Sequence, residues 1–128
     1  MSSQSKRKGS EWERDLEEYL NSQGLKARRL PRAGSKDIGD ISVSSNGVAL
    51  NHRILDVIFE AKNVRDAWGS MAQYLREADV EAENYSEKYD IPTIGVVATK
   101  TRQAGPGAGR IVMTVDTFID LLRWAGVV

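Results

Sequence analysis

Residues 54–62 read Ile-Leu-Asp-Val-Ile-Phe-Glu-Ala-Lys, an apolar run that ends in two charged side chains. Side chains alternate between the two faces of a strand, so Glu60 and Lys62 share one face, while Phe59 and Ala61 point into the body of the protein. A carboxylate and an ammonium at the end of an apolar strand are costly to bury without partners. This stretch therefore predicts a strand with a polar site at its end.

A second carboxylate is expected from the preceding strand, residues 38–43, where Asp40 lies within an apolar run. Two carboxylates and a lysine suit a hard divalent cation with a positive side chain beside it, which is the core of a metal-dependent nuclease. Asp37 could take the role of Asp40, but it follows a loop lysine, and Asp40 is the better candidate. Glu-x-Lys on a strand also occurs as an ordinary surface salt bridge. The choice between a nuclease site and a salt bridge therefore depends on the rest of the chain.

With 128 residues, 41% hydrophobic and 28% charged, the chain is large enough for one domain with a real core. We expect a flexible basic arm over residues 1–8 and a single domain over residues 9–128. The sequence contains no cysteine, which excludes disulfides and thiolate metal sites. It has no secretory signal and no apolar run as long as a membrane span, so we expect a cytoplasmic protein with no membrane partner, in the host cytoplasm if it is viral.

The charges of the chain balance to zero but are unevenly distributed. Residues 1–36 carry nine Lys or Arg against five Asp or Glu, whereas residues 66–90 carry two against seven. This segregation is typical of a protein with one anion-binding face and one solvated face. A basic tail beside an acidic helix, with no partner, would give the same distribution.

Periodicity and turn signals predict the remaining elements. The first half should contain a helix over residues 10–22 with Ser10 as N-cap and Glu13 as its capping-box partner, strands over 25–30 and 38–43, a turn at 44–47, a return through 48–50, and the strand over 54–62. The second half should contain a long helix over 66–89, a strand over 93–99, a mobile glycine-rich loop over 100–110, a strand over 111–115 and a helix capped by Asp116. This order, α-β-β-β-α-β-β-α, predicts an α/β fold with a mixed sheet flanked by helices.

The long helix carries an apolar stripe at spacings of three and four residues, formed by Ala67, Met71, Leu75, Ala78, Ala82, Tyr85 and Tyr89. Its acidic residues are expected to form the solvated face, and Gln73 is expected near the strand of Lys62. Trp68, Met71 and Trp124 are candidates for a subunit interface, although burial in the core is the commoner role for such residues.

This order of elements, with an aspartate on the second strand and Glu-x-Lys on the third, resembles the restriction-endonuclease-like nucleases of the PD-(D/E)xK type. The N-terminal half contains, in order, the motifs Arg7-Lys8-Gly9, Glu13-Arg14-Asp15-Leu16, Gly24 and Ala33-Gly34-Ser35-Lys36. This series of motifs looks like the archaeal-type Holliday-junction resolvases. The chain departs from the family pattern at Gly39, which stands where the family name has proline, and in the long interval between Asp40 and Glu60.

The resemblance implies an active site formed by Glu13, Ser35, Asp40, Glu60 and Lys62. It implies Mg²⁺, for which Mn²⁺ could substitute, held by Asp40, Glu60 and the backbone carbonyl of Ala61. Candidate phosphate contacts are Arg7, Lys8, Arg14, Arg28, Arg29, Arg32 and Lys36. The implied enzyme is a homodimer that cleaves four-way DNA junctions, because a twofold dimer presents two sites to the two symmetric strands.

Two other functions stay open on the sequence. A nuclease of the same superfamily could act on flapped, nicked or plain duplex DNA, and a non-catalytic nucleic-acid-binding module could retain the fold. The set of Asp40, Glu60 and Lys62 disfavours the module, since binding alone does not need two carboxylates together with a lysine. Cleavage of a four-way junction, compared with duplex and flap substrates, would separate the two nucleases.

Overall fold

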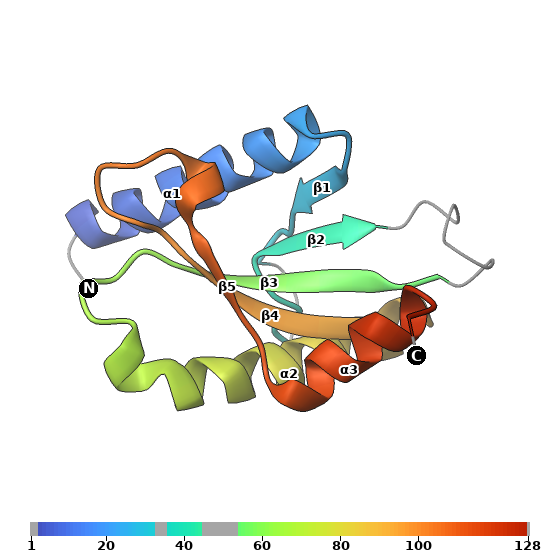
Figure 1. Ribbon diagram of the computed structural model, residues 1–128. Helices are drawn as coiled ribbons and strands as arrows, with labels where there is room; N and C mark the ends of the chain where they lie inside the picture. The colour runs from blue at the N-terminus through green and yellow to red at the C-terminus, as the bar shows by residue number, and fades with distance from the viewer. Residues whose placement is uncertain (1–2, 33–35, 45–53, 128) are drawn as a thin grey trace.

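The computed structural model describes residues 3–32, 36–44 and 54–127. Its elements are, in chain order, α1 (Ser3–Ser22), β1 (Lys26–Arg29), β2 (Ile41–Ser44), β3 (Asp56–Lys62), the 3-10 helix η2 (Trp68–Ser70), α2 (Met71–Tyr89), β4 (Thr93–Thr99), the 3-10 helix η3 (Pro106–Ala108), β5 (Arg110–Val112) and α3 (Val115–Trp124). The predicted order α-β-β-β-α-β-β-α is confirmed (Figure 1). The predicted return through residues 48–50 lies outside the described residues, as does most of the turn before it.

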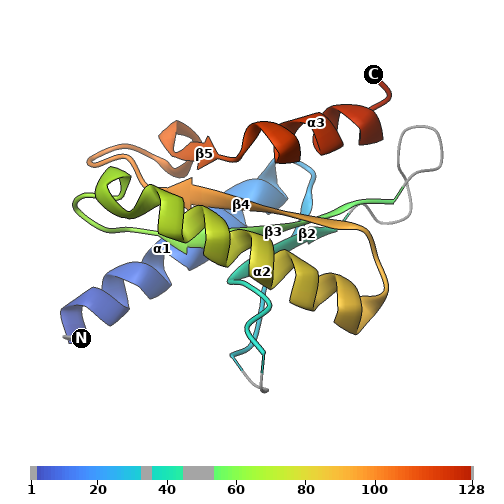
Figure 2. The same ribbon diagram turned by 90° about the horizontal axis from the view of Figure 1, so that it is seen from below.

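The five strands form one mixed sheet in the order β1-β2-β3-β4-β5. The first three are antiparallel neighbours, β4 is parallel to β3, and β5 is antiparallel to β4. A parallel pair requires a crossover connection, and α2 supplies it between β3 and β4. Figures 1 and 2 show α1 and α2 on opposite faces of the sheet. The sheet therefore separates two packed layers, and β3 contributes side chains to both.

The core on the α1 side is built around Trp12, which packs with Ile41 and Phe59. The indole Nε1 of Trp12 donates a hydrogen bond to the carbonyl oxygen of Ala98 at 3.2 Å, so the ring also ties α1 to β4. Phe59 is buried in this cluster and Ala61 packs against it, as the alternation along β3 predicted. The opposite face of β3 is thereby left to Glu60 and Lys62.

Helix α1 begins at Ser3, so the predicted start at Ser10 and its capping box were wrong. The residues before Ser10 include Gln4, Lys6, Arg7 and Lys8, which are good helix formers, and the helix extends through them although they bury nothing. Within the helix, the Ser10 hydroxyl oxygen accepts a hydrogen bond from Arg29 at 3.1 Å. Glu13 is buried in the structure and does not cap a helix end.

Gly95 on β4 allows α2 to approach the sheet closely. A Cβ at this position would lie 2.2 Å from the carbonyl oxygen of Ala78, so a larger residue would push the helix away. The predicted apolar stripe of α2 is buried at Met71, Ala78, Ala82 and Tyr85. The β4 strand is buried on both faces from Ile94 onward, also as predicted.

One acidic residue contradicts the predicted solvated face of α2. Glu81 is only 3% exposed, whereas Asp79 and Glu83 on the same helix are exposed. Glu81 lies three residues after Ala78 and four before Tyr85, so the helical period places it at the edge of the buried stripe. The α2 helix thus carries a carboxylate into the interior of the protein.

The C-terminal part differs from the prediction in its details. Helix α3 is capped by Thr114, whose hydroxyl oxygen accepts the Thr117 N–H at 3.1 Å, so the predicted cap at Asp116 was wrong. The glycine-rich segment contains η3, which packs against α1. Over the ranges described above, no helix combines the length and apolar character needed to cross a membrane.

Candidate active site

A groove of about 1160 Å³ lies between α1, the segment leading into β2 and the segment that follows β3. Its acidic lining residues are Glu13, Asp37, Asp40, Glu60 and Glu77, and its basic lining residues are Lys6, Lys8, Arg29, Arg32, Lys36, Lys62 and Arg65. The fold thus brings together four of the five residues predicted for the active site, namely Glu13, Asp40, Glu60 and Lys62. The fifth, Ser35, lies outside the described residues.

Asp40 is held by hydrogen bonds to β3 and to the residue that follows β1. It lies immediately before β2, whereas the prediction placed it inside the second strand, over residues 38–43. Its N–H donates to the carbonyl oxygen of Phe59 at 3.0 Å, and its carbonyl oxygen accepts the Leu30 N–H at 2.8 Å. The N–H of Ala61 donates to Asp40 Oδ2 at 2.9 Å. This last bond keeps the carboxylate beside the end of β3.

The residue before Asp40 has to be glycine in this fold. Gly39 has a φ of +99°, and a Cβ at this position would lie 2.2 Å from the side chain of Ile58. Proline, which stands here in the family name, cannot adopt a positive φ. The Gly39 N–H donates to Asp37 Oδ1 at 2.9 Å, so the Asp37 carboxylate takes part in the turn. This arrangement supports Asp40 over Asp37 as the candidate metal ligand.

Glu60 is buried among other acidic side chains. Burial raises the pKa of Glu60 well above its usual range, and contacts with the carboxyl groups of Glu81 and Asp40 raise it further. Burial also raises the pKa of Glu81, to about 7. Glu81 Oε1 is fully buried and has no hydrogen-bond partner among the described residues. Carboxylates this close repel one another unless a proton or a cation lies among them.

Lys62 is held between β3 and α2. Its Nζ lies 3.8 Å from Glu60 Oε1 and 3.7 Å from Glu77 Oε2. It also lies 4.5 Å from the ring centroid of Tyr74, a cation–π distance. Gln73 Nε2 donates to Glu77 Oε1 at 3.0 Å. The predicted proximity of Gln73 to the strand of Lys62 is therefore mediated by Glu77.

Glu13 approaches the site from α1 and is partly neutralised by two arginines. Arg32 Nη2 lies 3.3 Å from both Glu13 Oε2 and Asp40 Oδ1, and Arg29 Nε lies 3.7 Å from Glu13 Oε1. Burial and the charge of Asp40 raise the pKa of Glu13, while the two arginines oppose this rise. A guanidinium between two carboxylates indicates that this part of the groove favours a cation.

The predicted phosphate contacts divide into two groups. Lys8, Arg29, Arg32 and Lys36 line the groove, whereas Arg7, Arg14 and Arg28 are not among its lining residues. Arg28 and Arg29 are adjacent on β1 and point to opposite faces, and the charge of Arg28 acts on Tyr85 of α2. The prediction missed Lys6 and Arg65. Their charge was the only signal in the sequence, because no periodic pattern places them beside the site.

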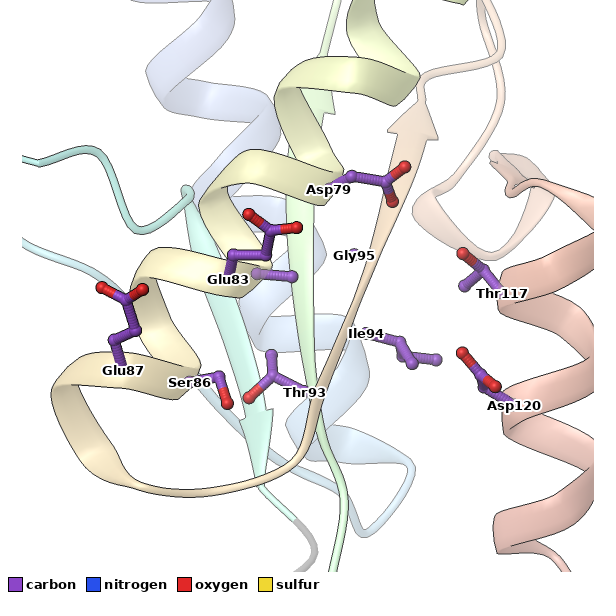
Figure 3. Close-up of a pocket in the computed structure, with 10 residues that line it drawn as sticks. Asp79, Glu83, Ser86, Glu87, Thr93, Ile94, Gly95, Thr117 and Asp120 are labelled. Carbon is purple, nitrogen blue, oxygen red and sulfur yellow. The ribbon is translucent and has the colours of Figure 1, made fainter.

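A second hollow, of about 450 Å³, lies between α2, β4 and α3 (Figure 3). Figure 3 shows Asp79, Glu83 and Glu87 on α2 and Asp120 on α3 around it. No lysine or arginine occurs among the described residues that line it, so it is unsuited to DNA phosphates. The uneven charge of the sequence thus corresponds to a basic groove and a separate acidic hollow.

The donor groups of the groove fit a hard divalent cation such as Mg²⁺. Asp40 and Glu60 offer carboxylate oxygens next to the backbone of Ala61. In the described parts of the chain, no three carboxylate or imidazole side chains lie close enough to hold a metal by themselves. Mg²⁺ is commonly held by one or two carboxylates and keeps several waters. Two carboxylates and one carbonyl oxygen are therefore sufficient for it.

A mixed sheet that presents two carboxylates and a lysine at the ends of adjacent strands is typical of the restriction-endonuclease-like class of nucleases. The profile of one family, described as "Archaeal holliday junction resolvase (hjc)", matches residues 4–88, and the chain belongs to this family. The match extends from α1 through most of α2 and includes every predicted active-site residue. Resolvases of this family are crossover junction endonucleases, so this protein is a nuclease that resolves Holliday junctions. A comparison with curated proteins finds no match.

Proposed function

We propose that this resolvase hydrolyses the phosphodiester bonds of four-way junctions with Mg²⁺ in the groove between α1 and β3. The observation that supports this most strongly is the meeting of Asp40, Glu60 and Lys62 in a groove that six other basic side chains line. Carboxylates beside a lysine serve hydrolysis, whereas further lysines and arginines hold the phosphate backbone. Because a binding module needs only the second set, the presence of both in one groove favours a catalytic site.

In this proposal Asp40, Glu60 and the carbonyl oxygen of Ala61 hold Mg²⁺, and Mn²⁺ can replace it. When bound, the ion supplies charge neutralisation at the phosphate and lowers the pKa of water for attack. Lys62, whose Nζ lies 3.8 Å from Glu60 Oε1, orients the attacking water and stabilises the negative charge that develops on the phosphate.

Two further residues support the reaction in this proposal. Glu13 orients the site from α1, where it is linked to Asp40 through Arg32. Ser35 contacts the phosphate near the scissile bond, a role taken from the family resemblance. The neighbouring Lys36 has its Nζ 3.4 Å from Glu87 Oε2, an exposed pair that DNA phosphate can replace.

We also propose that the enzyme acts as a homodimer, in which two grooves face the two strands that are cut. Of the interface candidates, Met71 is buried within its own chain, whereas Trp68 is 62% exposed and stays available for a partner. Trp124 on α3 is half-buried. Sedimentation velocity of the protein, with Trp68→Ala as a comparison, measures whether a dimer forms and whether Trp68 contributes to it.

The proposal is tested by cleavage of a four-way junction, a duplex and a flap of matched sequence, with wild type and Glu60→Gln in Mg²⁺. We expect the wild type to cleave the junction preferentially and Glu60→Gln to bind it without cleaving it. Asp40→Asn and Lys62→Ala should behave like Glu60→Gln. Near-normal turnover by Glu60→Gln would show that the site is misplaced. Equal binding and cleavage of junction and duplex would instead indicate a general nuclease, and wild-type binding without cleavage would indicate a non-catalytic module.

A further inference from the structure

A row of side chains on α2 faces the polar face of β3. The helix row is Gln73, Glu77, Glu81 and Tyr85, at intervals of four residues, and the strand row is Lys62, Glu60, Ile58 and Asp56, at intervals of two. Four helical residues rise about 6.0 Å and two strand residues about 6.6 Å, so the two rows stay in register over several steps. Because α2 is the crossover between parallel strands, it returns antiparallel to β3, and the rows meet in opposite order.

The contacts follow this register. Glu77 Oε2 lies 3.7 Å from Lys62 Nζ, and the carboxyl group of Glu81 contacts that of Glu60. One turn further along α2, Tyr85 packs with Ile58, and its hydroxyl reaches past Ile58 to donate to Asp56 Oδ2 at 2.8 Å. Each polar residue on this face of β3 is therefore met by a side chain of α2.

Glu81 is costly for a purely structural residue. It is among the most buried carboxylates of the described chain, and its Oε1 has no hydrogen-bond partner there. An unpaired buried carboxylate destabilises a fold, and an apolar side chain would extend the neighbouring stripe of Ala78 and Ala82 without that cost. The Glu81 carboxyl group contacts that of Glu60, which indicates that Glu81 serves the site on β3.

We propose that Glu81 and Glu77 are positioning residues of the active site, where Glu81 sets the orientation of the Glu60 carboxylate and Glu77 that of the Lys62 ammonium. This inference rests on the proposed roles of Glu60 and Lys62. It predicts different effects for the two residues. Loss of Glu81 should weaken metal binding, because Glu60 is a metal ligand. Loss of Glu77 should slow cleavage at saturating metal, because Lys62 acts on the water and the phosphate.

The first experiment measures Mn²⁺ binding to the DNA-free protein by calorimetry. Glu81→Leu should weaken the affinity by at least about tenfold, the usual size of an outer-sphere effect. Glu81→Gln, whose amide can donate a hydrogen bond to Glu60, should stay within about threefold of wild type. Glu83→Gln, an exposed change on the same helix, is the matched control and should bind like wild type. Circular dichroism and the melting temperature report whether each variant is folded.

Two outcomes of this titration would overturn the role of Glu81. One is wild-type affinity in folded Glu81→Leu. The other is a loss in Glu81→Gln as large as that in Glu60→Gln, which would make Glu81 a ligand and not a positioning residue. If Glu81→Leu does not fold, the comparison of Glu81→Gln with Glu83→Gln decides. In that case, an Mn²⁺ affinity of Glu81→Gln that differs from wild type by more than about threefold counts against the role.

The second experiment measures single-turnover cleavage of a four-way junction against Mg²⁺ concentration. Glu77→Ala should lower the rate at saturating Mg²⁺ by about tenfold or more while the half-saturating concentration changes less than about twofold. Glu77→Gln should recover part of this rate, because its amide oxygen still presents a partial negative charge to Lys62. A wild-type rate in Glu77→Ala would overturn the role of Glu77.

The Glu60→Gln variant separates this inference from the proposed function. If Glu60→Gln keeps its cleavage and Mn²⁺ affinity, the proposed active site is wrong. If Glu60→Gln loses both while Glu81→Leu and Glu77→Ala resemble wild type, only the positioning roles fail.

Discussion

Removal of the Tyr85 hydroxyl tests how much the contact between α2 and the buried first residue of β3 contributes to the stability of the protein. Asp56 is 1% exposed, and its Oδ2 accepts a hydrogen bond from the Tyr85 hydroxyl at 2.8 Å. Its other carboxyl oxygen, Oδ1, is buried and has no hydrogen-bond partner among the described residues. In Tyr85→Phe, the ring would still fill its place in the core, but Asp56 would stay buried without that donor.

A hydrogen bond to a charged group contributes about 1.5–3 kcal/mol, and leaving a buried acceptor unpaired adds its desolvation cost. We therefore expect Tyr85→Phe to lower the free energy of unfolding by about 2–3 kcal/mol, measured by urea unfolding at pH 7. Tyr89→Phe is the matched control, because its ring centroid lies 4.6 Å from that of Tyr85 and the residue is 39% exposed. The control should stay within about 0.5 kcal/mol of wild type.

The same hydroxyl predicts a dependence on alkaline pH. Burial, followed by the contact with Asp56, raises the pKa of Tyr85 to about 12, while an unfolded tyrosine titrates near 10. The stabilisation from this raised pKa is fully present below pH 10 and is lost as the pH rises towards 12. Since Tyr85→Phe has no phenol to titrate, its difference from wild type should shrink above pH 10. A variant within about 0.5 kcal/mol of wild type at pH 7 would refute the dependence of Asp56 on this donor.

Gly95→Ala should lower the free energy of unfolding by about 1–3 kcal/mol, because the new Cβ meets the backbone of Ala78; an unchanged urea midpoint would contradict the close approach of α2. Changing Arg29 and Arg32 to alanine should weaken junction binding and reduce the salt slope of its affinity by about two, and titrations with the slope of wild type would exclude both from phosphate contact. Ser35→Ala should slow single-turnover cleavage much more than it weakens junction binding, and an unchanged rate would leave Ser35 only a turn residue. A four-way junction should bind at least about tenfold more tightly than a duplex at one salt concentration, a gap of roughly 1.4 kcal/mol or more, and equal affinities would contradict recognition by shape.

The helical and strand periodicity of the sequence was sufficient to predict the order of the elements and the residues that form one face of the site. The strand period places Glu60 and Lys62 on one side of β3 and Phe59 in the core, and the structure agrees. The apolar run of β4 and the buried stripe of α2 were recognisable for the same reason. Asp40 could be singled out because a lone carboxylate inside an apolar run needs a partner, and the antiparallel pairing of β2 with β3 brings it to Glu60.

The start of α1 could not be inferred from the sequence, because Ser10 carries a good capping signal that the longer helix overrides. The charge of Arg28 and Arg29 was visible, but a period of two says only that they point apart, and the packing of α1 and α2 decides which of them reaches the groove.

Only the tertiary structure decided which residues support the site from a distance in sequence. The helical period already placed Glu81 next to the apolar stripe. A charged residue at the edge of such a stripe is nevertheless expected to face solvent, unless the residue that packs against it is known. That neighbour is set by how deeply α2 docks on the sheet at Gly95 and by its antiparallel register along β3. Local periodicity determines which residues share a face, whereas the contact between two faces depends on the packing of segments far apart in the chain.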